Sequence, residues 1–170
     1  SGLTSLTQGI TIQDNDDLLD LNGLANIETV AGNFQIYRNG ITTLDGLENL
    51  KTIGGITLIS NNYDLVSIEG LSNLVFVGSD FYLEGGKSPN FNGLSNLDSV
   101  GGNFGLCSDS IKNYTGLSDL TYIGGDFNGR CTAFTSMDGL PSLSFIGGAL
   151  HLEWSDLVTL GSLPSLDTIA

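Results

Sequence analysis

The sequence predicts a parallel β-solenoid, a fold in which each coil is one copy of a short repeat. Two regularities support this prediction. A Gly-Leu pair, replaced by Gly-Ser-Leu in the last copy, recurs at steps of 23, 24, 23, 23, 23 and 22 residues, at Gly23, Gly46, Gly70, Gly93, Gly116, Gly139 and Gly161. The spacing of apolar residues inside each copy is also fixed. Because so short a unit cannot bury its own apolar residues, successive copies are expected to stack and share one core.

The apolar spacing predicts one short strand in each copy. Position zero of each copy is the apolar residue that comes just before the glycine-rich corner, namely Leu6, Val30, Ile53, Val77, Val100, Ile123 and Ile146. Position four is then Ile10, Phe34, Thr57, Phe81, Phe104, Phe127 and Leu150, and position six is Ile12, Ile36, Ile59, Leu83, Leu106, Gly129 and Leu152. This two-residue alternation is typical of a strand with one buried face. A second ladder, three residues before position zero, predicts a compact apolar turn at Leu3, Ile27, Leu50, Leu74, Leu97, Leu120 and Leu143.

Stacked coils of this length and leucine content indicate a leucine-rich-repeat solenoid of about seven turns with little regular helix. The repeat runs without a break, so residues 1–170 are expected to form a single domain. Phe34, Phe104 and Phe127 should then lie in one interior column. Since neither end of the repeat carries a polar cap, the domain is expected to belong to a longer chain or to associate end to end.

Two turn motifs have alternative interpretations. Residues 14–17, Asp-Asn-Asp-Asp, offer oxygen ligands for calcium but lack the spacing and distal glutamate of an EF-hand loop. Asn15, Asn39 and Asn62 share position nine, where an asparagine side chain is expected to bond the turn backbone instead. Glycine pairs such as Gly101-Gly102 are expected to lie at a tight corner that needs both positive φ and close backbone approach, rather than to hold phosphate.

Composition disfavours several partner classes. The chain has a formal charge of −14, with 19 acidic residues against five basic ones. Such a surface repels the phosphates of nucleic acid and of anionic membranes. No apolar run approaches the length of about 18 residues that a membrane span needs, so this segment is not expected to insert into a membrane. No cofactor and no metal site is predicted.

The repeat resembles that of a known family over nearly all 170 residues. The pattern G-L-x-x-L-x-x-I-G-G-x-F-x-I-x-x-N, as in residues 23–39 and 93–109, is similar to the leucine-rich repeats of the receptor L-domain family. That family includes ligand-binding lobes of insulin-type and epidermal-growth-factor-type receptors and similar repeats in microbial surface proteins. The resemblance implies a right-handed parallel solenoid, extracellular or at the cell surface, that binds proteins or other ligands. The chain lacks the dense cysteines of the animal receptors, so it is more similar to the microbial cell-surface type.

The predicted ligand-binding surface is the exposed face of the sheet. If positions four and six face the core, positions five and seven face solvent. These outer columns vary where the inner columns repeat, which leaves them free to carry recognition residues, and aromatic rings with polar tips suit both protein partners and sugars. Trp154, near a strand end, could instead tuck against a neighbouring coil, and residues 84–90 are either a lip of the site or a tolerated loop variation. The candidate residues are Gln35, Tyr37, Leu58, Tyr82, Glu84, Asn128, Arg130, His151, Glu153 and Trp154.

Other roles are less well supported. The main alternative is a structural spacer or adhesive stalk in a larger surface protein. An enzyme would need more than His151 and Glu153 on one strand face, because no nucleophile or oxyanion donor accompanies them, and no catalytic residue is predicted. Ice binding would need a flat lattice of one small residue, which the outer columns lack.

The two cysteines leave a further question open. Cys107 and Cys131 are 24 residues apart, on neighbouring strands and one position out of register. A Cα separation of about 6 Å is within disulfide range, although neighbouring strand positions face opposite ways. A disulfide would fit a protein in an oxidising compartment, whereas two separate thiols would not require an oxidising compartment.

Overall fold

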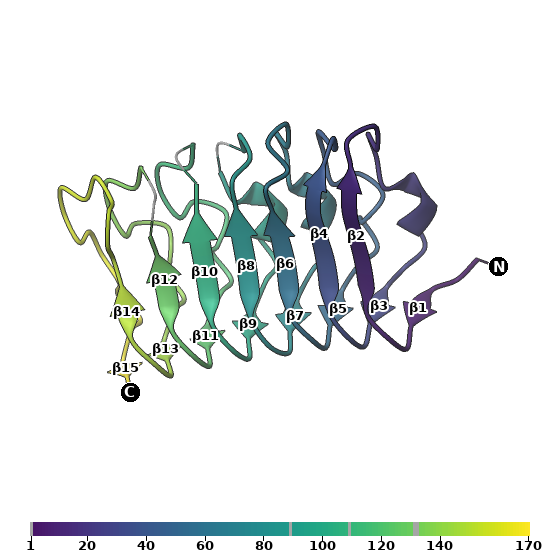
Figure 1. The fold of residues 1–170 in the computed structure, drawn as a ribbon. Helices are drawn as coiled ribbons and strands as arrows, with labels where there is room; N and C mark the ends of the chain where they lie inside the picture. The colour runs from purple at the N-terminus through teal and green to yellow at the C-terminus, as the bar shows by residue number, and fades with distance from the viewer. Residues whose placement is uncertain (1, 89, 109, 131–132) are drawn as a thin grey trace.

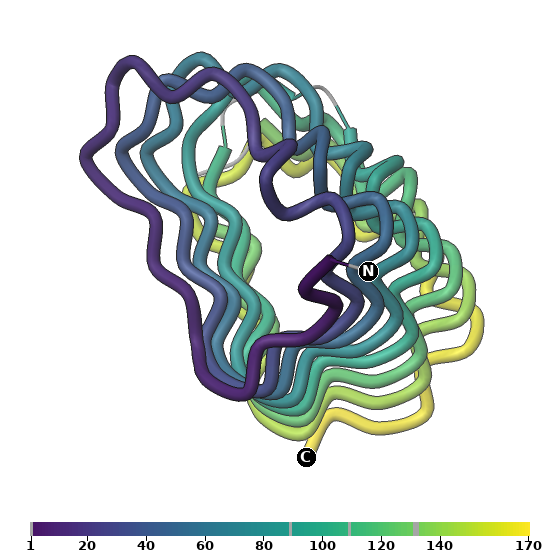
Figure 2. Tube along the Cα trace, turned by 90° about the vertical axis from the view of Figure 1, so that its right-hand side faces the viewer, coloured from purple at the N-terminus to yellow at the C-terminus, as the bar shows by residue number. Residues whose placement is uncertain are grey.

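The computed structural model describes residues 2–88, 90–108, 110–130 and 133–170, and the chain winds into one solenoid (Figure 1). The coils follow one another along a single axis, and the two termini lie at opposite ends of the stack. Along that axis the coils share a similar closed outline around one interior (Figure 2). The predicted right-handed parallel solenoid of about seven turns is confirmed.

Each coil contributes to two parallel sheets in the described part of the chain, whereas one strand per coil was predicted. The long-strand sheet contains the predicted strands: β2 (Ile10–Asn15), β4 (Phe34–Asn39), β6 (Thr57–Ser60), β8 (Phe81–Glu84), β10 (Phe104–Cys107), β12 (Phe127–Gly129) and β14 (Leu150–His151). The short-strand sheet contains β1 (Ser5–Leu6), β3 (Thr29–Val30), β5 (Thr52–Ile53), β7 (Phe76–Val77), β9 (Ser99–Val100), β11 (Tyr122–Ile123), β13 (Phe145–Ile146) and β15 (Thr168–Ile169). Its strands are two residues long, too short to show any alternation in the sequence.

The interior columns have the predicted register. The position-four residues pair across the long-strand sheet from Ile10 and Phe34 through to Phe127 and Leu150. The Phe104 ring centroid lies 5.4 Å from that of Phe81 and 5.5 Å from that of Phe127. Like positions therefore stack on like positions, and the buried apolar residues form one continuous core.

An asparagine ladder runs across the ends of the first long strands. The Asn39 backbone N–H donates to Asn62 Oδ1 at 3.0 Å, and Asn62 Nδ2 donates to the Ile36 carbonyl at 2.9 Å. Asn62 is only 1% exposed, so these bonds satisfy buried polar groups, as predicted from position nine. In the fourth coil position nine is Gly86, which has no side chain, so the asparagine ladder does not extend to this coil.

The glycine corners are explained by close backbone approach. A Cβ on Gly101 would lie 2.4 Å from the Gly78 carbonyl oxygen, and one on Gly124 would lie 2.2 Å from that of Gly101. Among the described glycines, positive φ falls elsewhere, as at Gly46 with φ 98°. Glycine is needed at these corners because the coils would be forced apart by any side chain.

At the start of the apolar turns opposite the long strands, a side-chain oxygen accepts a hydrogen bond from the backbone N–H two residues on. In one coil Asn113 Oδ1 accepts from the Thr115 N–H at 2.9 Å, and in another Ser67 Oγ accepts from the Glu69 N–H at 3.2 Å. Three of these turns in the described chain are 3-10 helices: η1 (Asn22–Leu24), η2 (Glu69–Leu71) and η3 (Asn92–Leu94).

Candidate ligand-binding face

Four of the predicted ligand-binding residues meet in one depression on the outward face of the long-strand sheet. The depression, here called the notch, has a volume of about 320 Å³. Its walls come from the neighbours of β10, and its floor comes from β10 itself. The lining residues are Tyr82, Glu84, Gly105, Leu106, Cys107, Asn128 and Arg130.

The notch exists because Gly105 has no side chain. In the sheet register Gly105 lies between Tyr82 and Asn128, both in the outward column. A Cβ on Gly105 would lie 2.3 Å from Tyr82 Cδ1, so the tyrosine ring leans over the glycine backbone. Asn103 Nδ2 donates to the Tyr82 hydroxyl at 3.4 Å. The ring is thereby positioned as one wall of the notch.

Three other candidates lie on strands nearer the N-terminus and outside the notch. Gln35 and Tyr37 are on β4, and Leu58 is on β6, all half-buried on the same face. The Tyr37 hydroxyl donates to Gln13 Oε1, and its ring centroid lies 5.3 Å from the Arg38 guanidinium carbon. Tyr37 is therefore held by its neighbours and borders no depression shared with Tyr82.

The last three candidates lie at and beyond the end of β14. His151 Nδ1 lies 3.8 Å from Glu153 Oε1, and Nε2 lies 3.8 Å from Asp126 Oδ2. Arg130 Nε lies 3.6 Å from Glu153 Oε2, which links this group to the notch. The strand ends at His151, and Trp154 is 79% exposed, so Trp154 does not tuck against a neighbouring coil.

Ion pairs between neighbouring coils occupy most of the basic side chains. Lys51 Nζ lies 2.8 Å from Glu28, Lys87 Nζ lies 2.8 Å from Asp64, and Arg38 Nε lies 2.7 Å from Asp14. With the Arg130 contact, these pairs use four of the five basic residues in the sequence. Each exposed pair contributes little to stability, at most about 1 kcal/mol. Because only five basic residues oppose 19 acidic ones, most acidic side chains have no basic residue to pair with, and the net charge of −14 favours cationic partners.

The cysteine and metal hypotheses have different outcomes. Cys107 ends β10 and lines the notch, but Cys131 lies outside the described residues, so the disulfide stays a prediction. Asn15 belongs to the asparagine ladder, donating from Nδ2 to Asn39 Oδ1 at 3.0 Å. Within residues 2–88, 90–108, 110–130 and 133–170, no group of three or more His, Cys, Asp or Glu side chains is placed to hold a metal ion.

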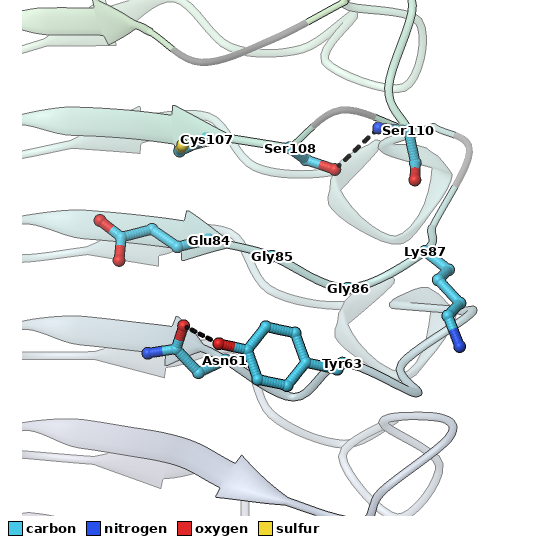
Figure 3. Close-up of a pocket in the computed structure, with 9 residues that line it drawn as sticks. All are labelled: Asn61, Tyr63, Glu84, Gly85, Gly86, Lys87, Cys107, Ser108 and Ser110. Carbon is cyan, nitrogen blue, oxygen red and sulfur yellow. Dashed lines mark hydrogen bonds between the residues drawn. The ribbon is translucent and has the colours of Figure 1, made fainter.

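A second depression, here called the rim depression, lies past the ends of β6, β8 and β10 (Figure 3). Its volume is about 480 Å³, and it shares Glu84 and Cys107 with the notch. Gly85 and Gly86, with φ of 74° and 76°, form part of its lining. The irregular segment 84–90 was the sequence signal for it, but the depression itself was not predicted.

Comparison with known proteins identifies the first part of the chain. The family model described as "Receptor L domain" matches residues 4–77. Over this stretch the chain is receptor L-domain-like. The matched residues run through β7 and include the three rungs of the asparagine ladder. No curated protein and no solved structure matches the chain. Across the described residues no helix has the length and apolar character needed to cross a membrane.

Proposed function

We propose that this domain is an extracellular or cell-surface recognition module that binds a protein or carbohydrate ligand through the outward face of the long-strand sheet. The observation that carries the proposal is the notch between Tyr82 and Asn128. The interior columns repeat from coil to coil, whereas the outer column loses its side chain at Gly105 and opens a concave site there. Ligand sites are typically concave with a few convergent polar groups, which fits this arrangement.

The residues around the notch provide complementary kinds of contact. Tyr82 offers an aromatic ring, Asn128 offers an amide, and Glu84 and Arg130 offer opposite charges. Tyr82, Glu84 and Asn128 lie in strands of one sheet and Arg130 directly follows β12, so little backbone conformational entropy is lost when a ligand binds. The receptor L-domain-like stretch supports a ligand-binding role in general terms.

The alternative function is a structural spacer or adhesive stalk. The ladders and ion pairs between coils would serve such a role equally well, but a spacer has no need of a concave site on one face. The two functions therefore differ in whether the outward face binds anything saturably.

The test is binding of the immobilised domain to an array of recombinant extracellular protein domains and to a glycan array. We expect saturable binding to at least one immobilised probe, and we expect the Tyr37→Ala, Tyr82→Ala double variant to lose it while remaining folded. Tyr122→Ala is the matched control, since Tyr122 is an aromatic residue, 42% exposed, on the short-strand sheet. Saturable binding that survives the double variant would exclude this face, and no saturable binding on either array would favour the spacer.

A further inference from the structure

The side chain that distinguishes the notch is Glu84. It lies on the same face of β8 as Tyr82, two residues along, at a Cα spacing of about 6 to 7 Å. Among the described residues, no hydrogen bond or ion pair reaches the Glu84 carboxylate. An exposed carboxylate beside an aromatic ring is thus left without a cation of its own.

The nearby cations are engaged elsewhere. Lys87 Nζ pairs with Asp64 at 2.8 Å, and the Lys87 ammonium and the Glu84 carboxylate point in opposite directions in Figure 3. Arg130 Nε faces Glu153 at 3.6 Å. Neither side chain neutralises Glu84, so a positive group from outside the chain would meet an uncompensated negative charge.

The charge of the whole chain acts in the same direction. At −14 the domain attracts cationic partners over about one Debye length, roughly 8 Å at physiological ionic strength, and repels anionic ones. This favours a basic protein over an acidic or sulfated glycan.

We propose that the notch binds the guanidinium group of an arginine side chain on a partner protein. This inference rests on the proposed function and names its ligand chemistry. The planar guanidinium stacks on the Tyr82 ring, its N–H groups donate to the Glu84 carboxylate, and the Asn128 amide oxygen accepts at the opposite wall. Arginine fits better than lysine, because a planar fork can stack and form a bidentate pair at once.

The rim depression gives the partner's main chain a place to lie. It adjoins the notch at Glu84 and Cys107 and continues over Gly85 and Gly86, where no side chain projects. A segment with its arginine in the notch can follow this surface out past the strand ends (Figure 3).

The test is an NMR titration of the ¹⁵N-labelled domain with N-acetyl-arginine amide. We expect saturable shifts of the amide signals of residues 82–84, 105–107 and 128. The neutral isostere N-acetyl-citrulline amide should bind at least about tenfold more weakly, because a charged hydrogen bond of about 1.5 kcal/mol or more is lost. Glu84→Gln should weaken arginine binding by about the same factor. Glu69→Gln removes one other exposed acid, at η2, and should leave arginine binding unchanged.

The outcomes separate this inference from the proposed function. Equal shifts with arginine and citrulline, equal losses in Glu84→Gln and Glu69→Gln, or shifts confined to other residues would overturn the arginine assignment. If a methyl hexoside shifts the notch signals and arginine does not, the arginine assignment is also wrong. The proposal that the outward face of the long-strand sheet binds a ligand is then retained. The proposed function itself is removed by the absence of saturable binding on both arrays, or by saturable binding that survives the Tyr37→Ala, Tyr82→Ala double variant.

Discussion

The receptor L-domain-like stretch and the coils that follow it share one backbone plan but differ in what their repeated positions carry. In residues 4–77, position nine supplies asparagine rungs and the outward position five always has a side chain. Past Val77, Gly86 and Gly105 remove those side chains in turn; the notch lies there, and the rim depression extends from there back to Asn61 and Tyr63. The difference teaches that a coil can lack the side chain at a repeated position and still keep its position in the stack, since the coils on both sides pack against it.

The largest expected effect on stability comes from a substitution in a tripeptide that occurs in both regions. Asn-Gly-Leu forms both η1 and η3, with Gly23 and Gly93 at their centres. A Cβ on Gly93 would lie 1.9 Å from the Ile68 carbonyl oxygen, whereas one on Gly23 would meet nothing within 4 Å. Gly93→Ala should lower the free energy of unfolding by about 3 kcal/mol, because the coils must move apart.

Gly23→Ala is the control for this prediction. It should leave stability unchanged or raise it by less than about 1 kcal/mol, because alanine narrows the unfolded ensemble without strain. Urea unfolding followed by circular dichroism measures both variants. Equal losses in the two would show that stacking distance between coils is not what requires glycine.

A smaller loss is expected at the last rung of the asparagine ladder. Asn62→Ala leaves the Asn39 N–H and the Ile36 carbonyl without partners in a buried site, and should cost about 2 kcal/mol. Asn96→Ala removes a single exposed bond, Nδ2 to the Ser72 carbonyl at 2.6 Å, and should cost less than about 1 kcal/mol. If thermal unfolding shows no difference between them, the buried bonds of the ladder do not stabilise the first region as described.

The smallest expected effect is a gain in stability from a substitution in the coils that follow Val77. Tyr114 is fully buried among aromatic rings, and its hydroxyl has no hydrogen-bond partner among the described residues. The hydroxyl occupies the space that Gly129 leaves, since a Cβ there would lie 2.6 Å from it. Tyr114→Phe should therefore stabilise the fold by about 1 kcal/mol, measured by urea unfolding at neutral pH.

The same variant tests a pH dependence. Burial raises the pKa of Tyr114 well above its ordinary value, so the folded protein holds a proton that the unfolded chain loses above about pH 10. The unfolded state then binds fewer protons, and stability falls by about 1.4 kcal/mol for each pH unit above that point. Tyr114→Phe should remove this contribution to the alkaline slope. An identical slope in both proteins would contradict the burial of the hydroxyl.

The sequence was sufficient to predict the features that repeat from coil to coil. Columns such as Phe34, Phe104 and Phe127, and the rungs Asn39 and Asn62, recur at fixed spacing, so stacking alone assigns their contacts. The short-strand sheet was missed because pairs such as Tyr122-Ile123 are too short to show a period.

The candidate site could be predicted only in part. Position five identified Tyr82 and Asn128 as outward, but the notch depends on the absent side chain at Gly105 and on the tilt of the Tyr82 ring. Position seven likewise identified Glu84 and Arg130, but only the structure shows that Arg130 faces Glu153 while no cation among the described residues pairs with Glu84. Single departures from the repeat carry no periodic signal, so their consequences had to come from the structure.

The most direct test of the account is to fill the notch. Gly105→Val and Thr11→Val place the same side chain in the outward position-five column. Gly105→Val places it between Tyr82 and Asn128, and Thr11→Val places it on β2, in the receptor L-domain-like stretch. Both variants should fold, and titration with N-acetyl-arginine amide should shift the notch signals in Thr11→Val as in the wild type but not in Gly105→Val. Unchanged binding by Gly105→Val would contradict the claim that this gap in the outward column is the recognition site.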